Sequence, residues 1–255
     1  MTKPNHQENN TILVSVIIPA YNSEKYIEKA IDSALIQEVP LEVIVINDCS
    51  PDRTSDVMRK YAEEPRVRYY ENKVRLGAAG TRNRAVTLSR GEYVAFLDCD
   101  DWWEPNKLKK QLKMMSKTGA VLCSTARRLI DSNTGTSKKI ISVKEIITYK
   151  MMLHQNWINC SSALIKRDVI AKYPMAYEDS HEDYITWLKI LKEYKFACAV
   201  NEPLLNYRVS KSGKSGSKIK SARMTFMVYR YMGFGFFHSI WYFCCYAING
   251  MLKYI

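Results

Sequence analysis

The 255-residue sequence lacks the patterns that several classes of protein require. No two of its 7 cysteines have CxxC spacing and their number is odd, so we expect neither a zinc site nor a disulfide framework, and a reducing compartment fits best. The first eleven residues are polar and contain no apolar segment of the kind found in secretory signals. A hydrophobic fraction of 47% and a charged fraction of 25% exclude disorder and collagen and indicate a folded globular protein.

Acidic residues are outnumbered by basic ones, and the imbalance is strongest near the end of the sequence. The formal net charge is +12, which favours acidic partners such as nucleic acid, anionic lipid or phosphorylated small molecules. No recognised nucleic-acid-binding motif is present, so we do not expect a nucleic acid partner. Residues 203–255 contain no Asp or Glu, but they contain eight basic residues: Arg208, Lys211, Lys214, Lys218, Lys220, Arg223, Arg230 and Lys253.

Short apolar segments alternate with helical patterns through the first half of the sequence. Apolar, β-branched stretches predict strands at residues 14–18, 41–46, 67–70 and 93–97. Helical spacing predicts helices at residues 24–37, 54–63, 77–89 and 107–117. We expect Gly91 to end the third helix as a left-handed C′ glycine. This alternation predicts an α/β fold with right-handed βαβ units and a mostly parallel, Rossmann-like sheet.

Beyond residue 118 the pattern is looser. Strands are predicted at residues 120–126 and 161–165, a hairpin tip at 131–135 and a helix at 184–191. With no internal repeat and no long linker, residues 12–210 are predicted to form one domain, followed by a basic and aromatic helical tail at 211–255.

Three carboxylates directly follow the fourth predicted strand. In an extended segment, Asp98 and Asp100 would point to one side and Cys99 to the other. Mutual repulsion of such charges, about 1 to 4 kcal/mol per pair at about 4 Å, is removed by a divalent cation such as Mg²⁺ or Mn²⁺. An acidic solvated turn is the alternative. The preceding apolar strand and the following Trp102 and Trp103 favour the metal site.

Other polar residues also follow strands, where parallel α/β sheets bind their ligands. Asp48 could accept hydrogen bonds from a base or a ribose, although an Asx-turn that only shapes the loop explains it slightly better. Gly77, Gly80 and Arg82 begin a helix that could face a phosphate, and close helix–sheet packing explains the glycines equally well. Residues 213–215 resemble a P-loop only superficially, so we favour a flexible basic loop that closes over phosphates.

Glu182 and Asp183 begin the helix predicted near residues 184–191. Two carboxylates in a first turn commonly complement the helix dipole, which is the simplest explanation. As a general base, either would need its pKa raised, since the helix dipole lowers the pKa of a carboxyl group. Burial or neighbouring acids would have to raise it.

Segments 16–22, 45–50, 77–83, 96–102 and 182–184 occur in this order and together resemble the family-2 inverting glycosyltransferases with a GT-A fold, of the bacterial polysaccharide and O-antigen type. The resemblance covers about residues 12–210. It implies nucleotide contacts at several strand ends and on the basic loop, from Pro19, Tyr21, Asn22, Asp48, Arg82, Asp98, Arg208 and Lys211.

The resemblance also implies individual roles. Asp48 would bind the uracil or other base, Asp98 would touch the ribose, and Asp100, with Asp98, would coordinate Mn²⁺ or Mg²⁺. Asp183 would be the catalytic base, and Glu182 would support it or contact the acceptor.

Arg208 and Lys211 would neutralise the leaving diphosphate. The implied reaction is metal-dependent, inverting transfer of a sugar from a nucleotide-sugar, expected to be a UDP-hexose. The implied acceptor is a saccharide, expected to be linked to a lipid diphosphate, and a β-glycosidic bond would form during cell-surface polysaccharide synthesis.

Two other functions are considered. A nucleotidyltransferase that makes an NDP-sugar would need a glycine-rich basic loop after the first strand, which residues 20–24 do not provide. A non-catalytic, membrane-bound, nucleotide-binding scaffold would not need the intact acidic motifs.

The tail predicts contact with a membrane. Residues 231–252 carry no formal charge and are long enough to cross a bilayer as a helix, but Gly233, Gly235, His238, Ser239 and Asn249 weaken that interpretation. The many aromatic residues favour the bilayer interface, and the basic residues favour anionic lipid. We therefore expect an interfacial or re-entrant helix at the cytosolic leaflet of the inner membrane. A helix packed on the catalytic domain or on a second subunit is the alternative.

Overall fold

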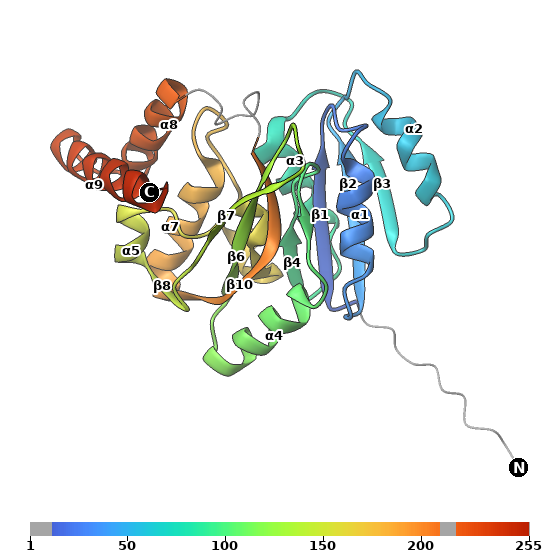
Figure 1. Ribbon diagram of the computed structural model, residues 1–255, viewed down its shortest axis with the longest axis horizontal. Coiled ribbons are helices and arrows are strands. Elements are labelled where there is room, and N and C mark those ends of the chain that lie inside the picture. The colour runs from blue at the N-terminus through green and yellow to red at the C-terminus, as the bar shows by residue number, and fades with distance from the viewer. Residues whose placement is uncertain (1–11, 210–217, 255) are drawn as a thin grey trace, which may run out of the picture.

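The computed structural model describes residues 12–209 and 218–254, and the structural statements below concern these residues. Lys211 and the predicted basic loop at residues 213–215 lie outside them. One central sheet carries helices on both faces, with a helical tail at one side (Figure 1). The predicted α/β class with a mostly parallel central sheet is confirmed.

The sheet combines two parallel groups of strands. Its order is β3-β2-β1-β4-β9-β6-β10-β5, with β7 paired to β6 and β8 paired to β10. Strands β3, β2, β1 and β4 are parallel, β6 and β10 are parallel, and antiparallel β9 joins the two groups. The strands are β1 (Val14–Ala20), β2 (Leu41–Asn47), β3 (Val67–Glu71), β4 (Tyr93–Phe96), β5 (Trp102–Trp103), β6 (Leu122–Asp131), β7 (Ser137–Ile141), β8 (Ile146–Thr148), β9 (Leu164–Lys166) and β10 (Phe196–Val209).

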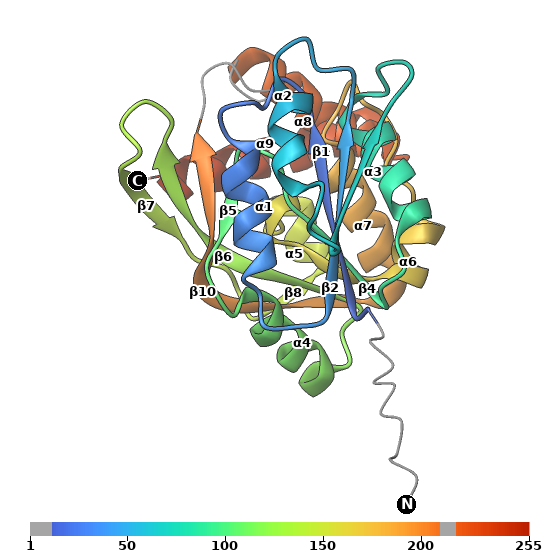
Figure 2. The ribbon, with the colours of Figure 1, turned by 90° about the vertical axis from the view of Figure 1, so that its right-hand side faces the viewer.

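Helices cover both faces of this sheet (Figure 2). The helices are α1 (Ile27–Leu35), α2 (Thr54–Met58), α3 (Gly77–Leu88), α4 (Lys107–Thr118), α5 (Tyr149–His154), α6 (Arg167–Lys172), α7 (Glu182–Tyr194), α8 (Lys218–Tyr231) and α9 (Phe236–Tyr254). The first predicted helix begins later than expected, at Ile27, and the strand predicted at 161–165 begins only at Leu164, after a 3-10 turn.

Alternate residues of the central strands enter two different cores. Ile17 and Ile44 belong to the core that contains α7, whereas Val16, Ile18 and Val43 belong to the core that contains α1. All five side chains are fully buried or nearly so. A strand buried on both faces needs an uninterrupted apolar sequence, which is why these segments were recognisable.

The prediction for Gly91 is wrong. Helix α3 ends at Leu88, Ser89 caps it in an extended conformation, and Gly91 is not left-handed. Its backbone instead lies against the start of β1, where an added Cβ would come within 2.6 Å of the Ser15 nitrogen and 2.8 Å of the Val14 carbonyl carbon. Close approach of two backbones, and not the helix end, requires glycine here.

The tail forms two helices that lie side by side next to α5 and α7 (Figure 1). From α8, Met224, Val228 and Tyr229 are buried, and the last two belong to the same core as α7. One side of α9 packs on this core through Tyr242 and Tyr246, among others. In the described ranges, no helix is long and apolar enough to cross a membrane.

Candidate active site

The polar residues predicted at the strand ends meet at the carboxyl edge of the sheet. Pro19 is in β1 beside Ile46 of β2, and the chain turns immediately afterwards at Asn22, which is left-handed with φ of 54°. Tyr21 is 39% exposed, and the guanidinium of Arg75 lies 3.8 Å from the centre of its ring. Arg75 is a cation beside the predicted nucleotide site that sequence analysis missed, because nothing in its own segment distinguishes it.

The loop after β1 is held by side chains from the loop after β2. Asn22 N donates to Ser50 Oγ at 3.1 Å, Ser23 N donates to Thr54 Oγ1 at 3.0 Å, and the next backbone N–H binds the Asp52 carboxylate at 2.9 Å. These N–H groups therefore do not form a cradle for a phosphate, as the first loop of a nucleotidyltransferase would.

Asp48 is buried and bonded to its surroundings. Its carboxylate accepts hydrogen bonds from Asn72 Nδ2 at 2.6 Å, Leu76 N at 2.7 Å and Gly77 N at 2.8 Å. A carboxylate has about four acceptor positions, so one is left for a ligand. These bonds support the simpler interpretation of Asp48, in which its side chain shapes the loop. The remaining acceptor position still allows Asp48 to bind a base.

Helix α3 begins against carboxylates. Beyond the two bonds to Asp48, Ala78 N and Ala79 N donate to the Glu178 carboxylate at 3.1 and 2.8 Å. Gly77 has φ of +73°, and an added Cβ would come within 2.8 Å of the Glu178 side chain. The N–H groups that the sequence suggested for a phosphate are therefore occupied by protein carboxylates.

Arg82 links two parts of the predicted site. Its guanidinium is buried, and it donates to Glu182 Oε1 at 2.8 Å and to Asp98 Oδ1 at 2.5 Å. Helix α3 places this cation between the end of β4 and the start of α7. Such a charge-assisted pair fixes both carboxylates in position.

Glu182 and Asp183 differ in their surroundings. Glu182 is 5% exposed and bound to Arg82, whereas Asp183 is only partly buried. Burial, and then the negative charge of Glu182, raises the pKa of Asp183 to about 7. This outweighs the lowering effect of the helix dipole, so Asp183 can exchange a proton near neutral pH.

The acidic segment after β4 is a turn. We expected an extended chain with Asp98 and Asp100 on one side, but Asp101 N donates to the Asp98 carbonyl at 3.0 Å and closes a turn. β4 ends at Phe96, so strand alternation does not continue into these residues. Their geometry could therefore not be read from strand periodicity.

The three acids of this turn have different roles in the structure. Asp101 is 1% exposed and accepts a hydrogen bond from Arg208 N at 2.8 Å. Asp98 and Asp100 are partly exposed. Burial, and then the charge of Asp98, raises the pKa of Asp100 to about 6. Two hard, mutually repelling oxygen donors suit a divalent cation that also binds substrate phosphates.

No group of three or more His, Cys, Asp or Glu side chains within the described ranges is arranged to hold a metal ion. The protein offers two partly exposed carboxylates at this turn, and substrate oxygens would have to complete a coordination shell. The donor chemistry fits Mg²⁺ or Mn²⁺ on that condition.

Basic and aromatic side chains adjoin the acidic turn. Arg208 Nε donates to the Asp100 carbonyl at 3.0 Å, and its guanidinium lies 4.4 Å from the centre of the Tyr26 ring. Lys29 Nζ lies 3.4 Å from the centre of the Trp102 ring, and burial, and then the charge of Arg208, lowers the pKa of Lys29. The resemblance placed Arg208 on a basic loop, whereas the structure has it in β10, where it is bonded to the acidic turn. Lys29 was missed because it is one of many lysines.

The α/β sheet carries acidic residues, the basic end of β10 and the partly buried carboxyl group of Asp183 where its parallel strands end. This combination defines a GT-A-type glycosyltransferase. The chain belongs to glycosyl transferase family 2, whose sequence model matches residues 15–173. It is therefore a glycosyltransferase.

Curated relatives match nearly the whole chain. It is 36% identical over 244 residues to TuaG of Bacillus subtilis (strain 168), whose name assigns it provisionally to teichuronic acid biosynthesis; the match covers 94% of this chain and 97% of TuaG. It is 34% identical over 242 residues to WfaP of Escherichia coli, and this match covers 94% of this chain and 95% of WfaP. WfaP is named a UDP-Glc:alpha-D-GlcNAc-diphosphoundecaprenol beta-1,3-glucosyltransferase.

Solved structures share the fold at lower identity. TarS 1-349 of S. aureus, in complex with UDP-GlcNAc, has a TM-score of 0.71 and 20% identity, and the match covers 89% of this chain and 69% of that one. The mannosyltransferase PcManGT from Pyrobaculum calidifontis, in complex with GDP-Man and Mn²⁺, has a TM-score of 0.70 and 22% identity, covering 92% and 71%.

Proposed function

We propose that this glycosyltransferase moves a hexose from a UDP-sugar to a saccharide linked to a lipid diphosphate, with inversion at the anomeric carbon. The observation that carries the proposal is the Asp183 carboxyl, whose pKa is raised to about 7 and which is adjacent to the Arg82-bound Glu182. The names of WfaP and of the TarS complex support a UDP-sugar donor, and the name of WfaP supports the acceptor class.

Asp183 acts as the general base. It takes the proton of an acceptor hydroxyl while that oxygen attacks the anomeric carbon of the donor. The bond between this carbon and the nucleoside diphosphate breaks, and its electron pair leaves with the diphosphate. A single displacement of this kind inverts the anomeric centre, so an α-linked donor yields a β-glycoside. Glu182 holds Arg82 in place beside the reacting groups.

The nucleotide lies along the carboxyl ends of β1, β2 and β4. Pro19, Tyr21 and Asn22 border it, Asp48 binds the base with its remaining acceptor position, and Asp98 binds the ribose. Arg82 lies near the nucleotide and is held in place by the carboxylates of Asp98 and Glu182.

Asp98 and Asp100 would hold Mg²⁺ or Mn²⁺ together with the donor diphosphate. A bound cation there would stabilise the negative charge that develops on the diphosphate. The side chains of Arg208 and Lys211 neutralise this developing negative charge on the diphosphate. Arg208 already donates a hydrogen bond to the Asp100 carbonyl in the acidic turn. PcManGT, which has this fold, was solved with Mn²⁺ and a nucleotide-sugar.

The enzyme acts at the cytosolic face of the inner membrane, where a lipid-linked acceptor meets a soluble donor. The outward side of α9 supports this location. Phe237 is 83% exposed, Trp241 65% and Ile248 54%, at a spacing that places them on one face of the helix. Exposed basic residues of the neighbouring α8, including Arg223 and Arg230, suit anionic lipid.

One experiment tests the reaction. Purified enzyme is incubated with a panel of UDP-sugars and a synthetic GlcNAc-diphosphate lipid, and the products are analysed by mass spectrometry. We expect one UDP-sugar to add a single hexose to the lipid and to release UDP. UDP binding without any transfer would favour the nucleotide-binding scaffold. Formation of a UDP-sugar from UTP and a sugar phosphate would favour the nucleotidyltransferase.

A further inference from the structure

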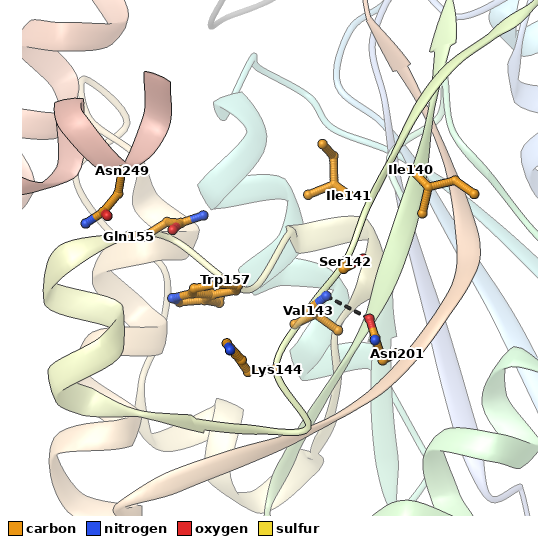
Figure 3. A pocket seen from close by; sticks show the side chains of 9 residues that line it. All are labelled: Ile140, Ile141, Ser142, Val143, Lys144, Gln155, Trp157, Asn201 and Asn249. Atoms are coloured by element: carbon orange, nitrogen blue, oxygen red, sulfur yellow. Dashed lines mark hydrogen bonds between the residues drawn. The ribbon is translucent and has the colours of Figure 1, made fainter. Parts of the chain in front are cut away.

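One concave site in the described part of the protein lies outside all the motifs discussed above. Its cavity has a volume of about 610 Å³ and lies between the segment after β7, the segment after α5 and the tail helix α9 (Figure 3). Polar side chains and one tryptophan dominate its lining: Ser142, Lys144, Gln155, Trp157, Asn201 and Asn249.

We propose that this cavity binds the saccharide of the acceptor and so directs its hydroxyl towards Asp183. The inference rests on the proposed function, since it assigns the acceptor subsite of the same reaction. It adds a binding site formed in part by the C-terminal helix, which no catalytic motif includes.

The lining has the chemistry of a sugar site. Gln155 and Asn249 present amide groups that both donate and accept hydrogen bonds, as hydroxyl groups do, and the ring of Trp157 lies between Gln155 and Lys144 (Figure 3). An aromatic ring offers a flat apolar surface to the apolar face of a pyranose. Among the described residues that line the cavity there is no Asp or Glu, and Lys144 is a cation that can face an anionic group of the acceptor.

The size and shape of the cavity also fit. About 610 Å³ is within the range of about 300–1,000 Å³ that small-molecule sites occupy, and it exceeds what a single sugar ring fills. Asn201 Oδ1 accepts a hydrogen bond from Val143 N at 2.9 Å, which fixes one wall across β10 (Figure 3).

A single short segment connects this cavity to the catalytic residues. Trp157 is three residues before Cys160, and three extended residues span at most about 10 Å. Cys160 is buried close enough to Arg82 and Asp183 for their charges to affect its thiol. The next residue, Ser161, accepts a hydrogen bond from Asp98 N through its hydroxyl at 3.1 Å. Trp157 in the cavity wall is therefore only a few residues along the chain from groups that adjoin Asp183 and the acidic turn.

Helix α9 forms the outer wall. Asn249 Nδ2 donates to the His154 carbonyl at 3.3 Å, and this bond ties α9 to the end of α5 directly before Gln155. The wall thus belongs to the same helix that exposes Phe237 and Trp241 on another part of its surface. A lipid-linked saccharide could enter the cavity while its lipid stays in the membrane beneath α9.

The test measures acceptor and donor kinetics separately in full-length protein. The variants are Trp157→Ala and Gln155→Ala, and the probe is the synthetic GlcNAc-diphosphate lipid used above, in detergent micelles. We expect KM for this acceptor to rise at least about tenfold in Trp157→Ala, as the loss of about 1.4 kcal/mol of binding would produce. KM for the UDP-sugar and the UDP dissociation constant are expected to stay within about twofold of wild type.

Ile36→Ala is the control, because it removes an exposed apolar side chain that neither lines the cavity nor belongs to the tail. It should leave the acceptor KM in micelles unchanged. An unchanged acceptor KM in both cavity variants would overturn the proposal. Wild-type protein that binds UDP and hydrolyses donor but shows no saturation with the acceptor would also overturn it. Failure to bind UDP at all would instead refute the proposed function itself. If Trp157→Ala does not fold, the acceptor KM of Gln155→Ala decides whether the cavity binds the acceptor.

Discussion

At the scale of single residues, two neighbouring carboxylates differ in how they meet Arg82, which forms an ion pair with Glu182 and acts on Asp183 only through its charge. Glu182 is paired with Arg82 at 2.8 Å, while burial and then the charge of Glu182 raise the pKa of Asp183 to about 7. A base near its operating pH transfers protons most efficiently. Under the proposed mechanism, the ion pair leaves Asp183 as the acid that can serve as the base.

We expect Asp183→Asn to lower kcat by about 10²- to 10⁴-fold, because the amide cannot accept the proton of the acceptor hydroxyl. Binding of UDP, measured by calorimetry, should stay close to wild type. Glu182→Gln is the matched control, since it removes one charge beside the same helix start. Should Glu182→Gln be inactive and Asp183→Asn fully active, the base has been assigned to the wrong residue.

Activity and stability should change in opposite directions with pH at Asp183. The rate should rise as pH increases through about 7, because the ionised form is the base. A folded-state pKa above the unfolded value of about 3.9 means that the group's favourable contribution is complete below pH 4 and is lost as pH rises through 7. Thermal unfolding at pH 8 should therefore occur at a higher temperature for Asp183→Asn than for wild type, and the difference should disappear near pH 4.

Asp100→Ala tests the metal assignment. We expect EDTA to abolish transfer by the wild-type protein and Mn²⁺ or Mg²⁺ to restore it, since Asp98 and Asp100 would share the cation with the diphosphate. The variant should be folded by circular dichroism and inactive at all metal concentrations. Asp100→Asn is the milder substitution and should retain part of the activity that Mn²⁺ or Mg²⁺ restores. Full activity of Asp100→Ala in the presence of chelator would rule the assignment out.

At the scale of elements, the contacts of a loop decide what its residues do. Gly91 looked like a helix end in the sequence, but its backbone touches that of Ser15 in β1, 76 residues away, and Gly91 N donates to Ser15 Oγ at 2.9 Å. The turn after β4 likewise takes its shape from Ser161 and Arg208, which approach from distant segments. Sequence spacing carries no information about such partners.

Gly91→Ala should therefore be strongly destabilising. Its Cβ would lie 2.6 Å from a backbone nitrogen, which cannot move away as a flexible side chain could. We expect a loss of about 1–3 kcal/mol in the free energy of unfolding, measured with urea. Gly235→Ala is the control, because an added Cβ there meets nothing within 4 Å. Equal stability of the two variants would contradict the close contact.

At the scale of the whole molecule, α9 has two unlike sides. Tyr242 and Tyr246 pack on the main core, while Phe237, Trp241 and Ile248 face outward. The tail is thus both a packed part of the structure and the bearer of an exposed apolar strip. Removing α9 would uncover Tyr229 of α8, on which Tyr242 stacks, so truncation would confuse loss of stability with loss of membrane binding.

Point substitutions separate the two. The triple variant Phe237→Ser, Trp241→Ser, Ile248→Ser should keep its unfolding temperature and lose most binding to vesicles that contain anionic lipid, measured by sedimentation. The vesicle binding that the triple variant retains should be sensitive to salt, because only the basic residues then attract the protein to the anionic lipid. A double variant, Ile36→Ser with Ile146→Ser, removes exposed apolar side chains elsewhere and should bind as wild type does. Equal vesicle binding by the triple variant would exclude α9 as the membrane contact.

The sequence by itself determined the class of fold, because strands buried on both faces require continuous apolar segments and these segments alternate with helical spacing. It also determined which residues to examine, since Asp48, Asp98 and Asp183 stand directly at the ends or starts of such segments. The order of the five motifs was sufficient to indicate the family, which the match over residues 15–173 confirms.

Only the tertiary structure decided what surrounds these residues. Arg82 joins Asp98 and Glu182 across 16 and 100 positions of the chain, and Asp48 closes on the start of α3. The cavity around Trp157 is assembled from four separate segments, one of them in the tail. Burial and charge pairing depend on groups that are close in space and distant in sequence, so the pKa of Asp183 and the shape of the cavity follow from the fold and not from any local pattern.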